Sequence, residues 1–154
     1  MKRRMPMLAA IAVLASVAPG MRPAEAAELD AADRAAVFAA AGFKQQGQDY
    51  VRCEDTTTVS REPGRIEVAD LNGDGQPEAW VTESSTYCYG STEQAFVLLG
   101  KDGAGEWHVL LDQVGIAVPL EARHKGWPDI EVGGPGFDAF PVYRFDGVTY
   151  VLPQ

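Results

Sequence analysis

The sequence is poor in the side chains that most often carry out catalysis. Its 154 residues include only two histidines, His108 and His124, and neither lies near a nucleophile signature such as Gly-x-Ser-x-Gly. The glycine-rich segment 133–136 lacks the lysine and the helix that follow a phosphate-binding loop. We therefore expect a protein that is not an enzyme. A small envelope hydrolase is the alternative, because the many acidic residues could include a glycosidase-like pair.

Long apolar runs are also missing. The longest one covers residues 7–18, whereas a membrane-spanning helix needs roughly 20 apolar residues. Basic residues precede this run, a Pro-Gly pair ends it, and Ala24-Glu25-Ala26 supplies the small residues that a signal peptidase requires. This three-part pattern predicts a secretory signal peptide over residues 1–26, with an uncleaved anchor as the alternative.

Cleavage after Ala26 would leave residues 27–154 as one calcium-loop domain in the periplasm or outside the cell. A chain of that length can bury roughly two-thirds of its unfolded surface. No cysteine follows the apolar run directly, so a lipid anchor is not expected. We also expect no stable membrane insertion after cleavage.

Acidic residues outnumber basic ones. The sequence has 22 Asp and Glu against 13 Lys and Arg, a formal net charge of −9. Removal of the basic leader would make the remaining chain more acidic still. This balance argues against nucleic acid and anionic lipid as partners and favours cations and basic proteins. A glycan is the other partner class, and acidity that only keeps an exported protein soluble is the alternative.

The two cysteines, Cys53 and Cys88, are far apart and do not form a Cys-x-x-Cys redox motif. In an oxidising compartment a lone pair is most simply one disulfide bond. Closing a loop of this size would stabilise the fold by roughly 4 kcal/mol in the chain-entropy model. Two free thiols are the alternative.

The apolar pattern predicts an α+β fold, with an N-terminal helix followed by a mostly antiparallel β-sheet. The helix is expected over residues 27–42, where Asp30 can act as N-cap and Gly42 can take the left-handed conformation after the last turn. Phe43 is expected to enter the core. Short runs between turn residues predict strands at 50–53, 65–69, 78–82, 95–99, 107–111, 129–132, 142–145 and 149–152.

Two segments of the expected sheet resemble each other. Residues 75–81, Gly-Gln-Pro-Glu-Ala-Trp-Val, are followed 51 positions later by Gly-Trp-Pro-Asp-Ile-Glu-Val at 126–132. This similarity suggests two degenerate β-repeats within the sheet, with chance similarity as the alternative. The second copy is preceded by the segment 121–125, which is basic, so no second ion site is expected.

The most specific motif is an acidic loop at residues 70–78. Oxygen-bearing side chains occur at Asp70, Asn72, Asp74 and Glu78, and Gln76 can offer its backbone carbonyl. Calcium prefers six to eight oxygen ligands in a forgiving geometry, whereas zinc would require His or Cys. The loop therefore predicts one structural Ca²⁺ held by these five residues. A turn rich in Asx and Gly that binds no ion is the alternative.

Two glycines, Gly73 and Gly75, allow the loop to curl tightly. The motif is not an EF-hand, because its twelfth position is Val81 and not a bidentate Glu. Its Asp-x-Asn-x-Asp-Gly-x-Pro-Glu pattern resembles the calcium loops of FG-GAP and VCBS-type repeats, in which such a loop joins two strands. The resemblance covers residues 67–81 and implies only the ligand roles given above.

A second candidate site surrounds Cys88. Ser84, Ser85, Tyr87 and Tyr89 combine small hydroxyls with tyrosines, which are side chains that make adaptable contact surfaces. These residues form a candidate recognition loop, and an ordinary polar loop fixed by the cysteine is the alternative.

Together these features predict an exported binding or interaction protein with one structural calcium and one disulfide bond. Its length, export, disulfide and acidity also fit an inhibitor of a basic, envelope-attacking enzyme of the lysozyme type, which is the alternative within the binding class. The sequence does not indicate an oligomeric state.

Overall fold

The computed structural model describes residues 28–54, 61–136 and 139–154. The predicted signal peptide lies outside this part of the chain. No helix among the described residues combines the length and the apolar character needed to cross a bilayer.

The elements in chain order are α1 (Ala31–Ala40), β1 (Lys44–Gln46), β2 (Asp49–Val51), β3 (Arg61–Ala69), β4 (Glu78–Ser85), α2 (Thr86–Tyr89), a 3-10 turn (Gly90–Thr92), β5 (Gln94–Lys101), β6 (Trp107–Val114), β7 (Ile116–His124), β8 (Trp127–Gly133), β9 (Val142–Phe145) and β10 (Tyr150–Val151).

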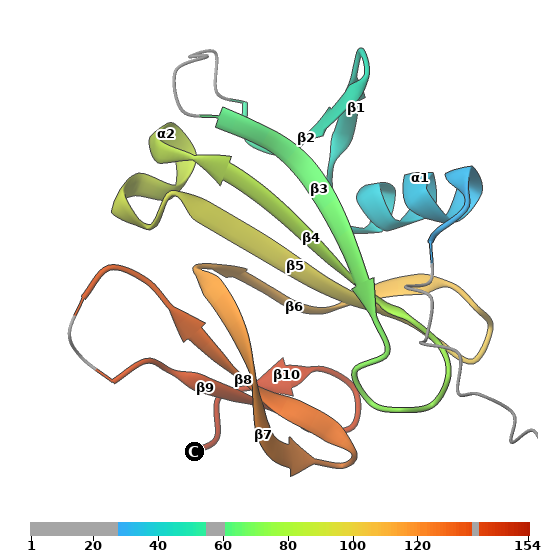
Figure 1. Cartoon of the computed structure of the whole chain (residues 1–154), viewed down its shortest axis with the longest axis vertical. Coiled ribbons are helices and arrows are strands. Elements are labelled where there is room, and N and C mark those ends of the chain that lie inside the picture. The colour runs from blue at the N-terminus through green and yellow to red at the C-terminus, as the bar shows by residue number, and fades with distance from the viewer. Residues whose placement is uncertain (1–27, 55–60, 137–138) are drawn as a thin grey trace, which may run out of the picture.

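The strands form three antiparallel sheets. Strands β1 and β2 make a hairpin, β3-β4-β5-β6 make a four-stranded sheet, which we call sheet 1, and β10-β9-β8-β7 make sheet 2. Figure 1 shows sheet 2 packed on one side of sheet 1, with α1 on the other side. The segments at 75–81 and 126–132 that resemble each other lie at the starts of β4 and β8.

The predicted α+β fold with one sheet is wrong, because the described residues form a mostly β, sandwich-like structure of three sheets. The physical reason lies in β5, which is buried continuously from Ala95 to Gly100. Side chains alternate between the two faces of a strand, so a strand buried along its whole length needs a covering layer on each side. One helix and one sheet cannot supply both covers.

The alternation along β4 and β5 divides the apolar side chains between two clusters. Between α1 and sheet 1, Val37 and Phe38 of the helix pack against the odd-numbered side chains of both strands; the buried members are Val37, Phe38, Ala41, Phe43, Ala79, Val81, Val97, Leu99 and Trp107. Between the two sheets, the even-numbered side chains of β5 meet sheet 2; the buried members are Phe96, Leu98, Leu110, Leu111, Ile130, Val132 and Tyr150.

The capping residues at the two ends of the N-terminal helix are those that the sequence predicts. Asp30 is the N-cap, and its carboxylate accepts a hydrogen bond of 2.8 Å from the backbone N–H of Asp33. Gly42 follows the C-cap with a φ of +80°, and its N–H donates to the carbonyl of Ala39. Phe43 is buried, as expected. The helix is four residues shorter at its start than predicted, because Asp30 terminates it there.

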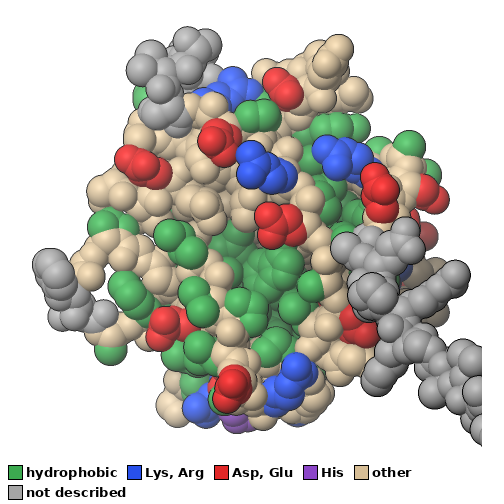
Figure 2. All heavy atoms as spheres, in the orientation of Figure 1, with side chains coloured by type: hydrophobic (Ala, Val, Ile, Leu, Met, Phe, Trp, Pro, Cys, Tyr) green, Lys and Arg blue, Asp and Glu red, His purple; other side chains and the backbone are tan. Residues whose placement is uncertain are grey.

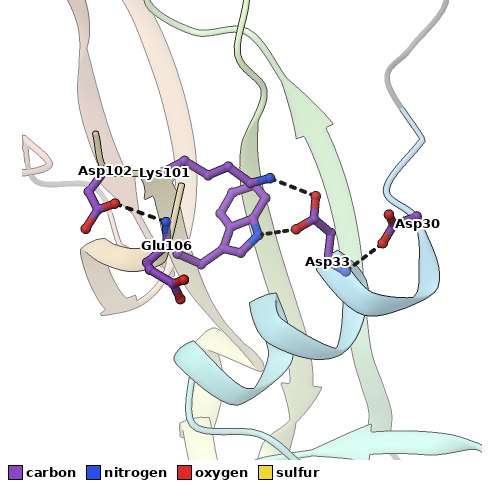
Figure 3. A network of polar contacts seen from close by, with 6 residues as sticks. Asp30, Asp33, Lys101, Asp102 and Glu106 are labelled. Carbon is purple, nitrogen blue, oxygen red and sulfur yellow. Dashed lines mark hydrogen bonds and ion pairs between the residues drawn. The ribbon is translucent and has the colours of Figure 1, made fainter. Parts of the chain in front are cut away.

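Asp33 ties this helix to sheet 1 (Figure 3). Its carboxylate accepts a 2.8 Å hydrogen bond and ion pair from Lys101 Nζ and a 3.2 Å hydrogen bond from Trp107 Nε1. The Lys101 ammonium also lies over the Trp107 ring, 5.0 Å from its centroid. The hydrogen bond from Lys101, followed by that from Trp107, holds the pKa of Asp33 below its ordinary value.

Replacing Asp33 by Asn should therefore remove an acid-sensitive contribution to stability. A lowered pKa in the folded state means that the charged carboxylate stabilises the fold above the ordinary value of 3.8 and that this contribution is lost as the pH falls. We expect Asp33→Asn to lower the free energy of unfolding at pH 7 by up to about 1 kcal/mol. Urea titrations should show the difference shrinking at acid pH, whereas Asp49→Asn, on an exposed hairpin, should behave like the parent protein.

A single glycine carries the chain from one sheet to the other. Gly115 separates β6, the edge of sheet 1, from β7, the edge of sheet 2, and its N–H donates to the carbonyl of Gln94. Its φ is +149°, a conformation that residues with a side chain rarely adopt. A Cβ atom there would lie 2.6 Å from Val132 Cγ1 and 2.8 Å from the carbonyl oxygen of Gly133. The close packing of the two sheets at this corner therefore requires glycine.

Gly115→Ala should be strongly destabilising, because it combines an unfavourable φ with a clash against backbone. The expected loss is about 2 kcal/mol or more in the free energy of unfolding, measured by urea denaturation. Gly103→Ala is the matched control, because nothing lies within 4 Å of a Cβ at that position. Equal stabilities of the two variants would contradict the role given to this corner.

Candidate functional site

The acidic loop connects β3 to β4 and folds its side chains back onto its own backbone. Asp70 Oδ1 accepts a hydrogen bond from the N–H of Gly73 at 2.7 Å, and Oδ2 accepts one from Gly75 at 3.0 Å. Asn72 accepts from the N–H of Asp74, and Asp74 accepts from that of Gln76. Both glycines have positive φ values, of 80° and 86°. The loop is thus a tight series of Asx turns, in which the side chains of Asp70, Asn72 and Asp74 face inward.

Glu78 closes this loop from within the protein. It is only 3% exposed, and its Oε2 accepts a 2.7 Å hydrogen bond from the N–H of Leu71. Burial, together with the nearby charges of Asp74 and Asp70, raises the pKa of Glu78 to about 7. A negative charge on Glu78 is therefore costly in the protein alone, and a bound cation would offset that cost.

The structure places all five predicted calcium ligands in one turn but does not gather three acids around one point. Across residues 28–54, 61–136 and 139–154, no three His, Cys, Asp or Glu side chains are grouped closely enough to hold a metal ion. The side chain of Asn72 and the carbonyl of Gln76 fall outside that count of residue types. The chemistry of the loop suits a cation, and calcium binding by Asp70, Asn72, Asp74, Gln76 and Glu78 stays a prediction.

The loop also links the two sheets. The carbonyl of Leu71 accepts a 2.9 Å hydrogen bond from Arg123 of β7, which donates as well to the carbonyl of Gly126. The side chain of Leu71 packs against the cluster between the sheets. A change in the conformation of the loop would therefore alter the contact between sheet 1 and sheet 2.

The predicted disulfide is confirmed. Cys53 and Cys88 are bonded, with their Cα atoms 6.1 Å apart, and they join the segment after β2 to α2. Beside the bond lies Glu83, which is 2% exposed. Its carboxylate accepts hydrogen bonds from the N–H groups of Arg52 (2.9 Å) and Cys53 (3.0 Å) and from the hydroxyl of Tyr89 (2.6 Å). The buried carboxyl group thus has three donors, which offset the cost of removing it from water.

Removing the disulfide should weaken the fold substantially. The bond spans 35 residues, and the loss expected from the chain-entropy model is roughly 4 kcal/mol, or less if the reduced chain keeps structure. Urea midpoints of the protein and of the Cys53→Ser/Cys88→Ser variant measure it. Reductant should lower the midpoint of the parent and leave that of the variant unchanged; a loss below about 1 kcal/mol would contradict a stabilising role.

The candidate recognition loop does not form one surface. Ser84 faces the same side of sheet 1 as the second sheet, whereas Ser85 is fully buried and its hydroxyl accepts a hydrogen bond from the N–H of Cys88. Tyr89 is held by Glu83, and burial raises its pKa to about 12. Only Tyr87 is widely exposed, at 72%. Ser84 and Ser85 thus lie on opposite faces of β4, whereas Tyr87 and Tyr89 belong to α2.

One polar pair was missed by sequence reasoning. His124, at the end of β7, lies with its Nδ1 2.5 Å from Oδ1 of Asp129 in β8, a carboxylate that is 2% exposed and also lies 3.4 Å from Arg144. Five residues separate the two partners, which meet across the β7–β8 hairpin. His124 is thus paired with a carboxylate on the neighbouring strand.

A cleft of about 400 Å³ opens between sheet 1 and the edge of sheet 2. Figure 2 shows apolar side chains gathered in the middle of this face, with acidic and basic side chains beside them. The lining comes from β3, β4, β5 and β7: Glu62, Pro63, Arg65, Glu67, Trp80, Thr82, Glu83, Ser84, Gln94, Phe96, Ala117 and Pro119.

Register explains how the lining is arranged. Along β4, Trp80, Thr82 and Ser84 point to one face, and the antiparallel pairing sets them opposite Glu67, Arg65 and Glu62 of β3. On their other side they face Leu98, Phe96 and Gln94 of β5. In each row of paired residues across β3, β4 and β5, the residue of β3 at the edge of sheet 1 is charged. The residue of β5 is a core side chain or an amide.

Comparison of the chain with protein-family models, with curated proteins and with solved structures finds no match.

Proposed function

We propose that the chain is an exported, non-enzymatic binding protein that receives its ligand in the cleft between the two sheets. The cleft itself carries this proposal. Its volume of about 400 Å³ falls in the range of ligand sites, roughly 300–1,000 Å³. Its lining joins the aromatic rings of Trp80 and Phe96 to a larger number of polar and charged side chains, so it is more polar than most such sites.

Two features support export and rigidity. The Cys53–Cys88 bond fits an oxidising compartment, where disulfides persist. A calcium ion held at the loop by Asp70, Asn72, Asp74, Gln76 and Glu78 would stabilise the junction between the sheets, because Leu71 of the same loop is bonded to Arg123 of sheet 2. The disulfide bond and the calcium ion would each restrict the movement of segments that border the cleft.

The proposal of a non-catalytic role rests on where the reactive groups lie. The His124–Asp129 pair belongs to the β7–β8 hairpin and does not line the cleft. Asp129 of this pair also forms an ion pair with Arg144, and the two contacts of Asp129 join three strands of sheet 2.

Filling the cleft should abolish ligand binding while leaving the fold intact. We expect a panel of monosaccharides, oligosaccharides, amino acids and short peptides to include compounds that raise the melting temperature of the parent protein but not that of Thr82→Trp. Val148→Trp adds the same bulk at a side chain that is 70% exposed and outside the cleft, and it should respond like the parent. A panel that gives all three proteins the same response would contradict the proposal.

Calcium should stabilise the protein increasingly as its free concentration rises above the dissociation constant. Free calcium at 100 times its dissociation constant would add about 2.7 kcal/mol to the free energy of unfolding, a rise of several degrees in melting temperature over the chelated protein. Glu78→Gln should largely remove this rise. Asp102→Asn is the control, because Asp102 caps a similar turn by accepting from the N–H groups of Ala104 and Glu106. No calcium-dependent shift, with no heat of binding by calorimetry, would exclude the ion.

A further inference from the structure

We propose that the ligand of the cleft is a short, uncharged oligosaccharide. This inference rests on the proposed binding role and names the chemical class that the cleft would select. Three properties of the lining support it: its charge balance, its supply of hydrogen-bonding groups and its aromatic floor.

The charges around the cleft nearly cancel, although the whole chain is strongly acidic. Arg65 and Glu62 form an ion pair of 3.5 Å at the outer rim. Glu67 then remains as the one acid whose side chain stands on the cleft face of β3 without an opposing base. Glu83 contributes to the lining with its backbone alone. Its carboxylate lies on the opposite face of sheet 1, where it accepts hydrogen bonds from the N–H of Cys53 and the hydroxyl of Tyr89. A strongly charged ligand would find little complementary charge here, so the cleft favours a neutral one.

The polar groups of the lining suit a ligand with many hydroxyls. Thr82 and Ser84 carry hydroxyls that both donate and accept, the Gln94 amide also does both, and the Glu67 carboxylate accepts. In the described part of the chain, none of these four side chains makes a hydrogen bond to another residue. They stand on neighbouring strands about 4.8 Å apart and at alternate positions along β4. The hydroxyls of successive sugar units can form hydrogen bonds with these donors and acceptors.

Trp80 supplies the apolar part of the proposed site. It is half-buried, and its ring leans against that of Phe96, with centroids 5.7 Å apart and planes tilted by 52°. Phe96 is only 1% exposed, so its ring is a fixed surface against which the indole packs. Glu67 is the direct cross-strand partner of Trp80. An aromatic surface beside a hydrogen-bond acceptor matches a sugar ring, which has an apolar C–H face and a polar edge.

A cationic side chain is the competing occupant, because an aromatic ring next to a carboxylate also attracts an ammonium group. Arg65 disfavours it, since this guanidinium lies on the same strand and the same face of sheet 1 as Glu67. The two occupants differ in their response to salt, because only the cation depends on long-range attraction.

The indole N–H signals of the ¹⁵N-labelled, calcium-loaded protein report on the site directly. The sequence has three tryptophans, Trp80, Trp107 and Trp127, and Trp80→Phe assigns the signal of interest. The probes are maltotetraose, cellotetraose, chitotetraose and tetralysine, titrated at ~50 mM and ~500 mM NaCl. We expect at least one tetrasaccharide to shift the Trp80 signal saturably, with an affinity that does not change with salt, and to leave Trp107 in place.

Two conservative variants locate the contacts. Glu67→Gln and Thr82→Val should each weaken binding of that tetrasaccharide about three- to tenfold, because each replaces a hydrogen-bonding atom of the lining. Glu121→Gln, which changes an acid of β7 outside the cleft lining, should bind like the parent. Equal affinities for all variants, or binding that leaves the Trp80 signal unmoved, would place the sugar elsewhere and overturn the inference.

Two other outcomes separate this inference from the proposed function. If tetralysine alone moves the Trp80 signal, and does so only at low salt, the ligand class is wrong and the cleft remains a binding site. If no probe moves the Trp80 signal, the oligosaccharide is excluded. The comparison of the parent with Thr82→Trp then decides whether the cleft binds any other compound.

Discussion

The structure depends on one constraint, which is that the interior of sheet 1 is apolar on both faces. Strand β5 is buried from Ala95 to Gly100, with Val97 and Leu99 toward α1 and Phe96 and Leu98 toward sheet 2. If either α1 or sheet 2 were absent, a row of large apolar side chains of sheet 1 would be exposed to water. The helix, the corner at Gly115 and sheet 2 all follow from this requirement.

The cleft arises because the second cover is incomplete. Sheet 2 meets the part of sheet 1 that is apolar on that face, whereas the face of β3 and the adjoining part of β4 carry charged and hydroxylated side chains that need no cover. The edges of the two layers are tied at separate points, by the hydrogen bond from Arg123 to Leu71 at one end and by the corner at Gly115, whose N–H donates to the carbonyl of Gln94, at another. A polar surface bordered by fixed edges is what a binding site requires.

The sequence predicted local structure well and tertiary arrangement poorly. Asp30 as N-cap, the buried Phe43, the strand Val142–Phe145 and the disulfide are all confirmed, because each depends on local pattern or on a lone pair of cysteines. Strand β7 was missed, because Pro119 and its mostly exposed side chains break the usual signal of a strand. The separation into sheets and the cleft were also missed, since they depend on which strands pair across long distances in the chain. The His124–Asp129 pair was hidden because β7, the strand that carries His124, was not predicted.

The claim that most needs testing is that the uncovered face of β3 and β4 is the ligand surface. Hydrogen–deuterium exchange of the calcium-loaded protein, with and without the tetrasaccharide that binds most tightly, tests it without any substitution. The account predicts that protection increases in residues 61–69, 78–85 and 116–120, which surround the cleft. Protection confined to residues 86–92 around Tyr87, or to β9 and β10, would contradict it.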